Sequence, residues 1–169
     1  MVQIKLVSSE DEILQIKALQ TKNLRQHISD EEAASQGFLT ASYTIEYLKA
    51  MNASFPSVIA KEGEQVVGYA LITTPEMREG HDLIKDLFNN IDRCVYKDIL
   101  LRSAKYVVVG QLCVGKDSRG QHLVNRMYDH FANAVKGQYD YMVTDVDCDN
   151  HRSLKAHRSE EHTSELQSR

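Results

Sequence analysis

The sequence predicts a single α/β domain. Two observations lead to this fold class. Segments with the alternating hydrophobicity of strands are interspersed with segments whose apolar residues recur at helical spacing. The most apolar segment, Tyr106–Val114, has the character of a central strand buried on both faces. The 169 residues contain no internal repeat and no linker rich in proline or glycine, so one domain with a sizeable core is expected.

The first half of the chain predicts a strand, two helices and a β-hairpin. Ser9-Glu10-Asp11-Glu12 has the form of a capping box, which opens a helix. Glu62-Gly63-Glu64 separates two apolar runs, which is typical of a hairpin turn. The elements expected are a strand at 2–6, a helix after the capping box, a polar stretch at 25–38, a helix at about 44–51, and strands at 57–60 and 66–73.

The second half alternates helices with strands. In Gln121–Lys136 the apolar residues recur at i, i+3, i+4, i+7 and i+11, which predicts a helix with one core-facing stripe. The elements expected are a helix at 81–94, a strand at 106–114, a helix at 121–136, a strand at 139–146 and a helix from about 150.

Charge and cysteine content restrict the partners of the protein. A net charge of −4 argues against nucleic acid or an anionic membrane as the main partner. No apolar run approaches the length of a membrane span, and the N-terminal residues lack the apolar core of a signal peptide. Cys94, Cys113 and Cys148 are an odd number without paired spacing, as expected for reduced thiols. We therefore expect a cytoplasmic protein.

The stretch LCVGKDSRGQHLVNRMYDHF, residues 112–131, leads from a strand through a charged loop into a helix. A helix N-terminus exposes unpaired backbone N–H groups and the positive end of the helix dipole, which suits phosphate. Gly120 allows the backbone to approach a ligand closely, and Arg119 adds a positive charge. An ordinary loop with a solvated arginine remains the alternative.

This stretch resembles the acyl-CoA-binding segment of the GNAT superfamily of N-acetyltransferases. The family pattern is a strand that ends Leu-x-Val, a short loop, Arg/Gln-x-x-Gly-x-Gly/Ala and a long helix. Leu112 and Val114 match the strand, and Arg119-Gly120 matches the start of the loop pattern. The later glycine positions hold His122 and Val124, whose side chains are expected to narrow the groove.

Other segments in the right order resemble the same family. EEAASQGFLTASYTIEYLKAM is similar to the region that shapes the acceptor pocket, and SVIAKEGEQVVGYALI is similar to the second and third strands. DNHRSLKAH resembles the second family motif, Asn-x-x-Ser/Ala-x-x-x-Tyr, in which Asn150 and Ser153 match and His157 stands at the tyrosine position. The resemblance therefore covers nearly the whole chain up to His157, and it implies an α/β fold with a GNAT-like mixed β-sheet flanked by helices.

The resemblance implies that acetyl-CoA donates an acetyl group to an amine of a small molecule or protein by direct attack. Backbone groups of the strand end would bind the pantetheine arm and polarise the thioester carbonyl. Neither the acceptor, which Arg25–Phe38 would determine, nor the oligomeric state follows from the sequence, although family habit makes a homodimer plausible. The implied coenzyme-binding residues are Leu112, Cys113, Val114, Arg119, Gly120, Gln121, His122, Leu123, Val124, Asn150 and Ser153.

The implied catalytic residue is His157, because the family tyrosine at that position often protonates the leaving thiolate. Ordinary pKa values are about 6.5 for histidine and about 8.5 for a thiol, so an imidazolium is able to donate this proton. A partly exposed helix residue without a catalytic role is the alternative for His157. For the general base the candidates are the carboxylates Glu31, Glu32, Asp145 and Asp147, and the sequence does not distinguish them.

Two other kinds of site are rejected. Asp145-x-Asp147-x-Asp149 begins like an EF-hand loop, but Asn150 replaces its glycine and Ala156 its closing glutamate, so no metal is expected. Cys113 lies within an apolar strand, which predicts a buried and inert thiol.

The last residues, RSEEHTSELQSR, do not resemble the family and show no apolar periodicity. They resemble a translated sequencing-library adapter. We therefore expect an incomplete GNAT-like domain at 1–157, without the last strand or strands of the family, followed by an artefactual tail at 158–169.

Two other hypotheses about the function stay open beside that of an acetyltransferase. The missing glycines and the unidentified base are compatible with a non-catalytic acyl-CoA-binding module or an inactive fragment. An α/β domain without any coenzyme is the third reading.

Overall fold

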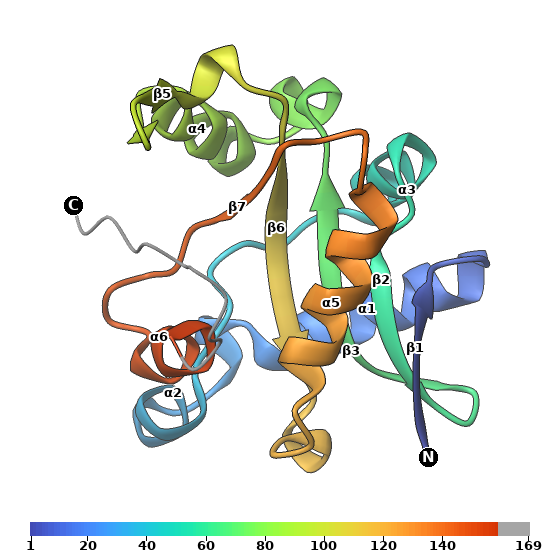
Figure 1. Cartoon of the computed structure of the whole chain (residues 1–169). Helices are drawn as coiled ribbons and strands as arrows, with labels where there is room; N and C mark the ends of the chain where they lie inside the picture. Colours follow the sequence, from blue (N-terminus) through green and yellow to red (C-terminus); the bar gives the residue numbers. More distant parts are fainter. Residues whose placement is uncertain (159–169) are drawn as a thin grey trace.

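A five-stranded mixed sheet runs through the middle of the structure (Figure 1). The computed structural model describes residues 1–158, of which the side chains of Ser35, Gln36 and Arg158 are left undescribed. In order across the sheet, the strands are β1 (Val2–Leu6), β2 (Val58–Glu62), β3 (Gln65–Thr73), β6 (Tyr106–Val114) and β7 (Tyr141–Thr144). Neighbouring strands from β1 to β6 are antiparallel, and β7 is parallel to β6.

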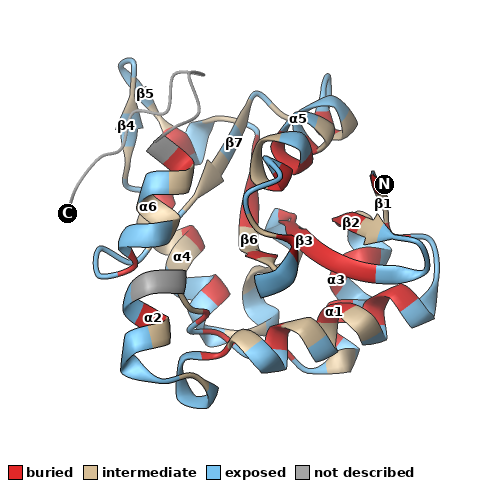
Figure 2. Cartoon of the chain, turned by 90° about the horizontal axis from the view of Figure 1, so that it is seen from below, coloured by how far each residue is buried: buried red, intermediate tan, exposed pale blue. Residues whose placement is uncertain are grey.

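Helices cover both faces of this sheet. The helices are α1 (Glu10–Asn23), α2 (Asp30–Gln36), α3 (Ile45–Ser54), α4 (Asp82–Ile91), α5 (Leu123–Val135) and α6 (His151–Arg158). The first core cluster lies under α1, α3 and α4, and the second lies under α5. Along β3, Tyr69 and Leu71 belong to the first cluster, whereas Ala70 and Ile72 belong to the second, as the two-residue period of a strand requires. Figure 2 shows buried residues along β3 and β6.

Short elements connect these helices and strands. Lys97 and Asp98 both have positive φ, which suits the tight two-residue turn of a hairpin. The short elements are β4 (Val95–Tyr96), β5 (Ile99–Leu100) and the 3₁₀ turns η1 (Arg25–His27), η2 (Pro75–Gly80), η3 (Leu101–Ser103) and η4 (Lys116–Ser118).

The expected fold class is confirmed, and the structure adds two elements that periodicity did not indicate. The hairpin of β4 and β5 has strands of two residues, which are too short to show alternation. Helix α2 forms inside the stretch expected to be polar because Ser29 caps it, accepting a hydrogen bond from the Glu32 N–H at 3.1 Å. Among the described residues of α2, Ala33 alone is buried, so the helix shows no apolar stripe.

The strand expected at 139–146 is shorter in the structure. Tyr139 belongs to the turn after α5, where its N–H donates to the Val135 carbonyl at 3.2 Å. The pairing of β7 with β6 ends at Thr144.

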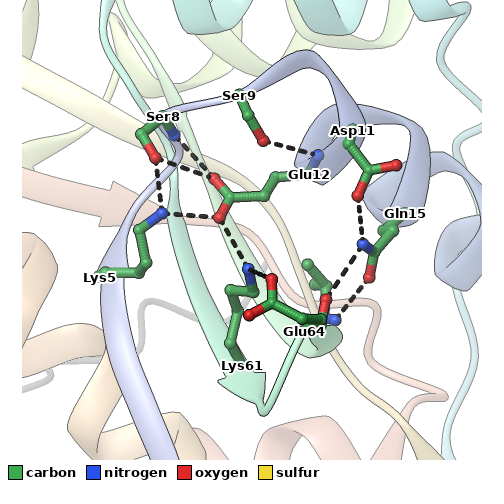
Figure 3. Close-up of polar contacts among 9 residues, drawn as sticks. Lys5, Ser8, Ser9, Asp11, Glu12, Gln15, Lys61 and Glu64 are labelled. Carbon is green, nitrogen blue, oxygen red and sulfur yellow. Dashed lines mark hydrogen bonds and ion pairs between the residues drawn. The ribbon is translucent and has the colours of Figure 1, made fainter.

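The buried carboxylate of Glu12 joins β1, α1 and β2 (Figure 3). The expected capping box is half formed, because Ser9 Oγ accepts from the Glu12 N–H at 3.3 Å. The Glu12 carboxylate instead accepts from the Ser8 N–H at 2.8 Å and from Lys5 Nζ at 2.6 Å, and Lys61 Nζ lies 3.2 Å away. Burial raises the pKa of Glu12, but these hydrogen bonds outweigh burial and lower it to about 2.

The tail expected at 158–169 lies outside the described residues, apart from the backbone of Arg158, which ends α6. Within residues 1–158, no helix combines the length and apolar character needed to cross a membrane. In the same part of the chain, no three histidine, cysteine, aspartate or glutamate residues cluster as metal ligands.

Candidate functional site

Strands β6 and β7 part half-way along β6. Their parallel pairing runs from Tyr106 and Tyr141 to Val109 and Thr144, but β6 continues to Val114. On its other side, β6 stays paired with β3 as far as Val114, which lies opposite Gly68. Figure 1 shows β7 leaving β6 and running toward α6. Among the described residues, no strand pairs with the second half of β6 on this side, so that edge is open.

A bulge marks the point of parting. Leu71 pairs with Gln111 and Ile72 pairs with Val109, which leaves Gly110 as the extra residue of β6. A Cβ atom on Gly110 would lie 2.2 Å from Thr73 Oγ1, so Thr73 leaves no room for a side chain at the bulge.

The register of β6 determines which backbone groups reach the open edge. Gly115 N–H donates to the Val67 carbonyl at 2.8 Å, which makes these two residues a hydrogen-bonded pair. Such pairs alternate in an antiparallel ladder, so Cys113 bonds toward β3, whereas Leu112 and Val114 direct their N–H and C=O groups toward the open edge. Of the three residues expected to bind the pantetheine arm, Leu112 and Val114 therefore face the open edge, where the Val114 carbonyl already accepts a hydrogen bond from Arg119 Nε.

A cavity of about 250 Å³ lies beside this edge. Its walls come from the end of β6, the loop after it, the start of α5 and the first turns of α6, with Asn23, Gly37, Phe38 and Leu39 closing the remaining side. Of the eleven expected coenzyme-binding residues, only Gln121 does not line it. Those that do are Leu112, Cys113, Val114, Arg119, Gly120, His122, Leu123, Val124, Asn150 and Ser153.

The loop that leads into α5 contains two residues with positive φ. Gly120 has a φ of 82°, and nothing lies within 4 Å of the position a Cβ would take, so a ligand can approach its backbone. His122 has a φ of 53° and occupies the N-cap of α5 without a capping hydrogen bond from its side chain. The first N–H groups of α5 have no partner inside the helix, and Leu123, Val124 and Asn125 line the cavity.

A protein-family model described as the acetyltransferase (GNAT) family matches residues 21–159. The chain belongs to the GNAT acetyltransferase family. This family transfers an acetyl group from acetyl-CoA to an amine, so the expected family, acyl donor and reaction class are confirmed.

Solved GNAT structures share the fold of this chain. A ribosomal-protein-alanine N-acetyltransferase from Brucella melitensis biovar Abortus has a TM-score of 0.59 and 13% identity, and the match covers 99% of this chain and 96% of that one. An aminoglycoside acetyltransferase from an uncultured soil metagenomic sample, in complex with sisomicin, has a TM-score of 0.61 and 12% identity, with coverage of 99% and 92%. A GNAT acetyltransferase from Brucella melitensis, in complex with acetyl-CoA, has a TM-score of 0.52 and 13% identity, with coverage of 91% and 81%. No curated protein matches the sequence significantly.

Arg119 of this GNAT domain is held against the cavity wall. Its Nε donates to the Val114 carbonyl at 3.1 Å, and its guanidinium donates to Asn23 Oδ1 at 3.2 Å. Burial lowers the pKa of Arg119, and an arginine nevertheless stays protonated in a protein. Beside it, burial raises the pKa of the Cys113 thiol to about 12, so this cysteine is not a nucleophile at neutral pH.

Asn150 is expected to bind coenzyme, but its polar atoms serve the fold in the free protein. Its Oδ1 accepts from the Ser153 N–H at 3.2 Å, which caps α6. Its Nδ2 donates to the Phe38 carbonyl at 2.9 Å. The residue thus ties α6 to the segment between α2 and α3.

His157, the expected catalytic residue, does not line the cavity. Nδ1 lies 2.7 Å from the Ser153 carbonyl, which only accepts, so Nδ1 carries the proton. Nε2 lies 2.6 Å from the Tyr128 hydroxyl and therefore accepts from it. Burial lowers the pKa of His157, so the ring is neutral and has no proton directed toward the cavity.

No carboxylate occurs among the described residues that line the cavity. Of the four base candidates, Glu32 lies 3.6 Å from Lys116 Nζ, and Asp147 accepts from the Asp149 N–H at 2.8 Å. Eight lining residues lie outside the matched motif positions, and the fold brings them to the cavity: Asn23, Gly37, Phe38, Leu39, Ser118, Asn125, Arg152 and Ala156.

Proposed function

We propose that this chain binds acetyl-CoA in the cavity beside β6 and transfers its acetyl group to an amine by direct attack. The open edge of β6 carries this proposal. The backbone groups of Leu112 and Val114 offer a strand-like hydrogen-bonding edge to the amides of a pantetheine arm. The remaining lining fits the coenzyme as well, because two arginines and an uncapped helix N-terminus suit its phosphates.

Acetyl-CoA supplies the acetyl thioester, and the residues of the chain hold it and polarise its carbonyl. The N–H groups on the open edge of β6 are donors on rigid backbone, as stabilisation of developing negative charge requires. Transfer by direct attack then depends on positioning an unprotonated amine beside the carbonyl. The segment Arg25–Phe38, which contains α2 and precedes α3, is proposed to select this amine.

The acceptor is proposed to be an amine of a small molecule or of a protein. The names of the similar structures include both kinds, a ribosomal-protein-alanine acetyltransferase and an aminoglycoside acetyltransferase bound to sisomicin. The fold they share with this chain does not decide between them.

The proposed role of His157 as proton donor requires its ring to leave the Tyr128 hydroxyl and take up a proton. Replacement of His157 by Ala should then lower the maximal rate more than the affinity for acetyl-CoA. An unchanged maximal rate in this variant would show that His157 only holds α6 in place and has no catalytic role.

The central experiment combines calorimetric titration of acetyl-CoA with a thiol-release assay on a panel of amines. Binding with turnover supports the enzyme. Binding of acetyl-CoA by the folded protein, with no turnover on any amine, supports the non-catalytic acyl-CoA-binding module instead. Absence of binding by the folded protein would contradict both.

Three further proposals concern the domain boundary, the cellular compartment and the oligomeric state. Residues 1–157 form the acetyltransferase domain and 158–169 an artefactual tail, so deletion of 158–169 should leave the thermal midpoint and coenzyme affinity of the domain unchanged. The protein is cytoplasmic, which the free cysteines among the described residues support and cell fractionation tests. It forms a homodimer, as family habit suggests, and light scattering of the purified chain tests this.

A further inference from the structure

The charge of the cavity lining is opposite in sign to the net charge of the chain, which is −4. Among the described lining residues, the permanently charged side chains are Arg119 and Arg152, and both are cationic. The resemblance to the family accounts for Arg119 alone, since the second motif specifies no residue at the position of Arg152. The lining therefore selects for an anion more strongly than the matched motif requires.

Arg152 lies in the first turn of α6, whereas Arg119 lies in the loop before α5, and both residues line the cavity. Its stem is supported by the chain after α2, because a Cβ on Gly37 would lie 3.5 Å from Arg152 Cβ. The side chain is exposed, and it forms no ion pair with any carboxylate of the described residues.

The pKa of Arg119 is sensitive to the charge of Arg152. The pKa of Arg119 is lowered first by burial and also by the positive charge of Arg152, while Glu32 on α2 opposes this effect. Like charges that share one cavity repel each other, and an anion placed between them removes the repulsion. A diphosphate presents oxygen atoms on both sides, so it is able to bond two guanidinium groups at once.

We propose that Arg152 binds the diphosphate of acetyl-CoA from α6, opposite Arg119, so that two arginines from different walls of the cavity clamp it. This assignment rests on the proposed function, which makes acetyl-CoA the ligand. It gives α6 a part in coenzyme binding beyond the matched positions Asn150 and Ser153.

The test is calorimetric titration of the full chain with acetyl-CoA and with its analogue that lacks the 3′-phosphate but keeps the diphosphate. Replacement of Arg152 by Ala should weaken the binding of both ligands by the same factor, roughly tenfold for one exposed charge-assisted contact. Replacement by Lys should give an intermediate loss, because the charge stays but the planar fork is lost. The matched control is Lys155→Ala, which removes one positive charge from an exposed position of α6 that does not line the cavity.

The outcomes separate this inference from the proposed function. Equal affinity of the wild type and Arg152→Ala for acetyl-CoA would overturn the clamp while leaving the proposed function intact. A loss seen only with acetyl-CoA, and not with the analogue, would overturn the assignment to the diphosphate. An equal loss of affinity in Lys155→Ala would show that only the net charge of α6 matters, and would overturn the clamp. If the folded wild type binds neither ligand, the proposed function fails, and the clamp fails with it.

Discussion

The hydroxyl of Tyr128 donates a hydrogen bond of 2.6 Å to Nε2 of His157, and this bond fastens α6 to α5. The other ring nitrogen of His157 donates to the Ser153 carbonyl, so the ring is bonded on both sides while it is neutral. Protonation of Nε2 would remove the acceptor that Tyr128 uses. The attachment of α6 therefore depends on the charge state of one buried histidine.

The first prediction is a loss of stability in mild acid that His157 causes. Its pKa is lower in the folded protein than in the unfolded chain, where it is about 6.5, so the unfolded state binds more protons. The contribution of neutral His157 to the stability of the folded protein is complete above about pH 6.5. It is lost as the pH falls from about 6.5 toward the lower pKa of the folded state. Urea unfolding at pH 7 and pH 5 should show a smaller loss for His157→Gln than for the wild type. His151→Gln, on the same helix but exposed, should keep the wild-type pH dependence, and identical profiles for all three proteins would contradict the prediction.

The second prediction concerns Glu12. Its pKa falls from 4.5 to about 2 on folding, which corresponds to a stabilisation of roughly 3 kcal/mol at neutral pH. Because the folded pKa is the lower one, this contribution is present above about pH 4.5 and is lost as the pH falls toward 2. Glu12→Gln should therefore destabilise the protein strongly at pH 7 and weakly near pH 2. Chemical denaturation at the two pH values measures this, with exposed Glu10→Gln as the control. A destabilisation of the same size at both would contradict it.

The third prediction concerns the bulge at Gly110. A methyl group there would meet Thr73 Oγ1 at 2.2 Å, so Gly110→Ala should destabilise the protein by roughly 1–3 kcal/mol and weaken acetyl-CoA binding. Thr73→Ala removes the clashing hydroxyl, which has no hydrogen-bond partner among the described residues. The double variant should recover part of both losses in a double-mutant cycle. Simple addition of the two single effects would show that this contact is not what excludes a side chain.

The fourth prediction concerns His122, which adopts the left-handed conformation at a position where the family pattern has glycine. His122→Gly should stabilise the protein by roughly 0.5–1 kcal/mol, because glycine takes this conformation without steric cost. It should also strengthen acetyl-CoA binding severalfold by widening the cavity. Gln121→Gly is the control, since its φ is not positive and glycine there only adds freedom to the unfolded chain. Equal or weaker coenzyme binding by His122→Gly would show that the imidazole does not narrow the cavity.

The elements that position the cavity could be predicted because each has a local signal. Tyr106–Val109 is continuously apolar since the first half of β6 is buried on both faces, and the stripe of α5 faces one core cluster. The spacing of Arg119-Gly120 after Leu112 and Val114 likewise locates the loop between them. Such signals lie within a single segment, and the residues they identify line one cavity.

What could not be predicted depends on how distant segments pack. Arg152 and Phe38 reach the cavity because α6 lies beside α2, a contact between residues more than a hundred positions apart. The motif places His157 at the catalytic position, but the docking of α6 on α5 turns its ring toward Tyr128. The partners of Glu12 come from two strands, so its capping box reveals only half of its role.

An open strand edge is ordinarily a hazard, because it invites pairing with another polypeptide and hence aggregation. In this protein the open edge of β6 does not lie at the rim of the sheet, since β7 begins beside it and α5 and α6 border the cavity that it faces. A second strand would bring side chains on both of its faces into this narrow space. The amide-bearing end of a pantetheine arm has no side branches, so it is thinner than a strand. The parting of β6 and β7 therefore leaves room for a thin ligand but not for another strand, so the walls of the cavity also protect this edge from aggregation.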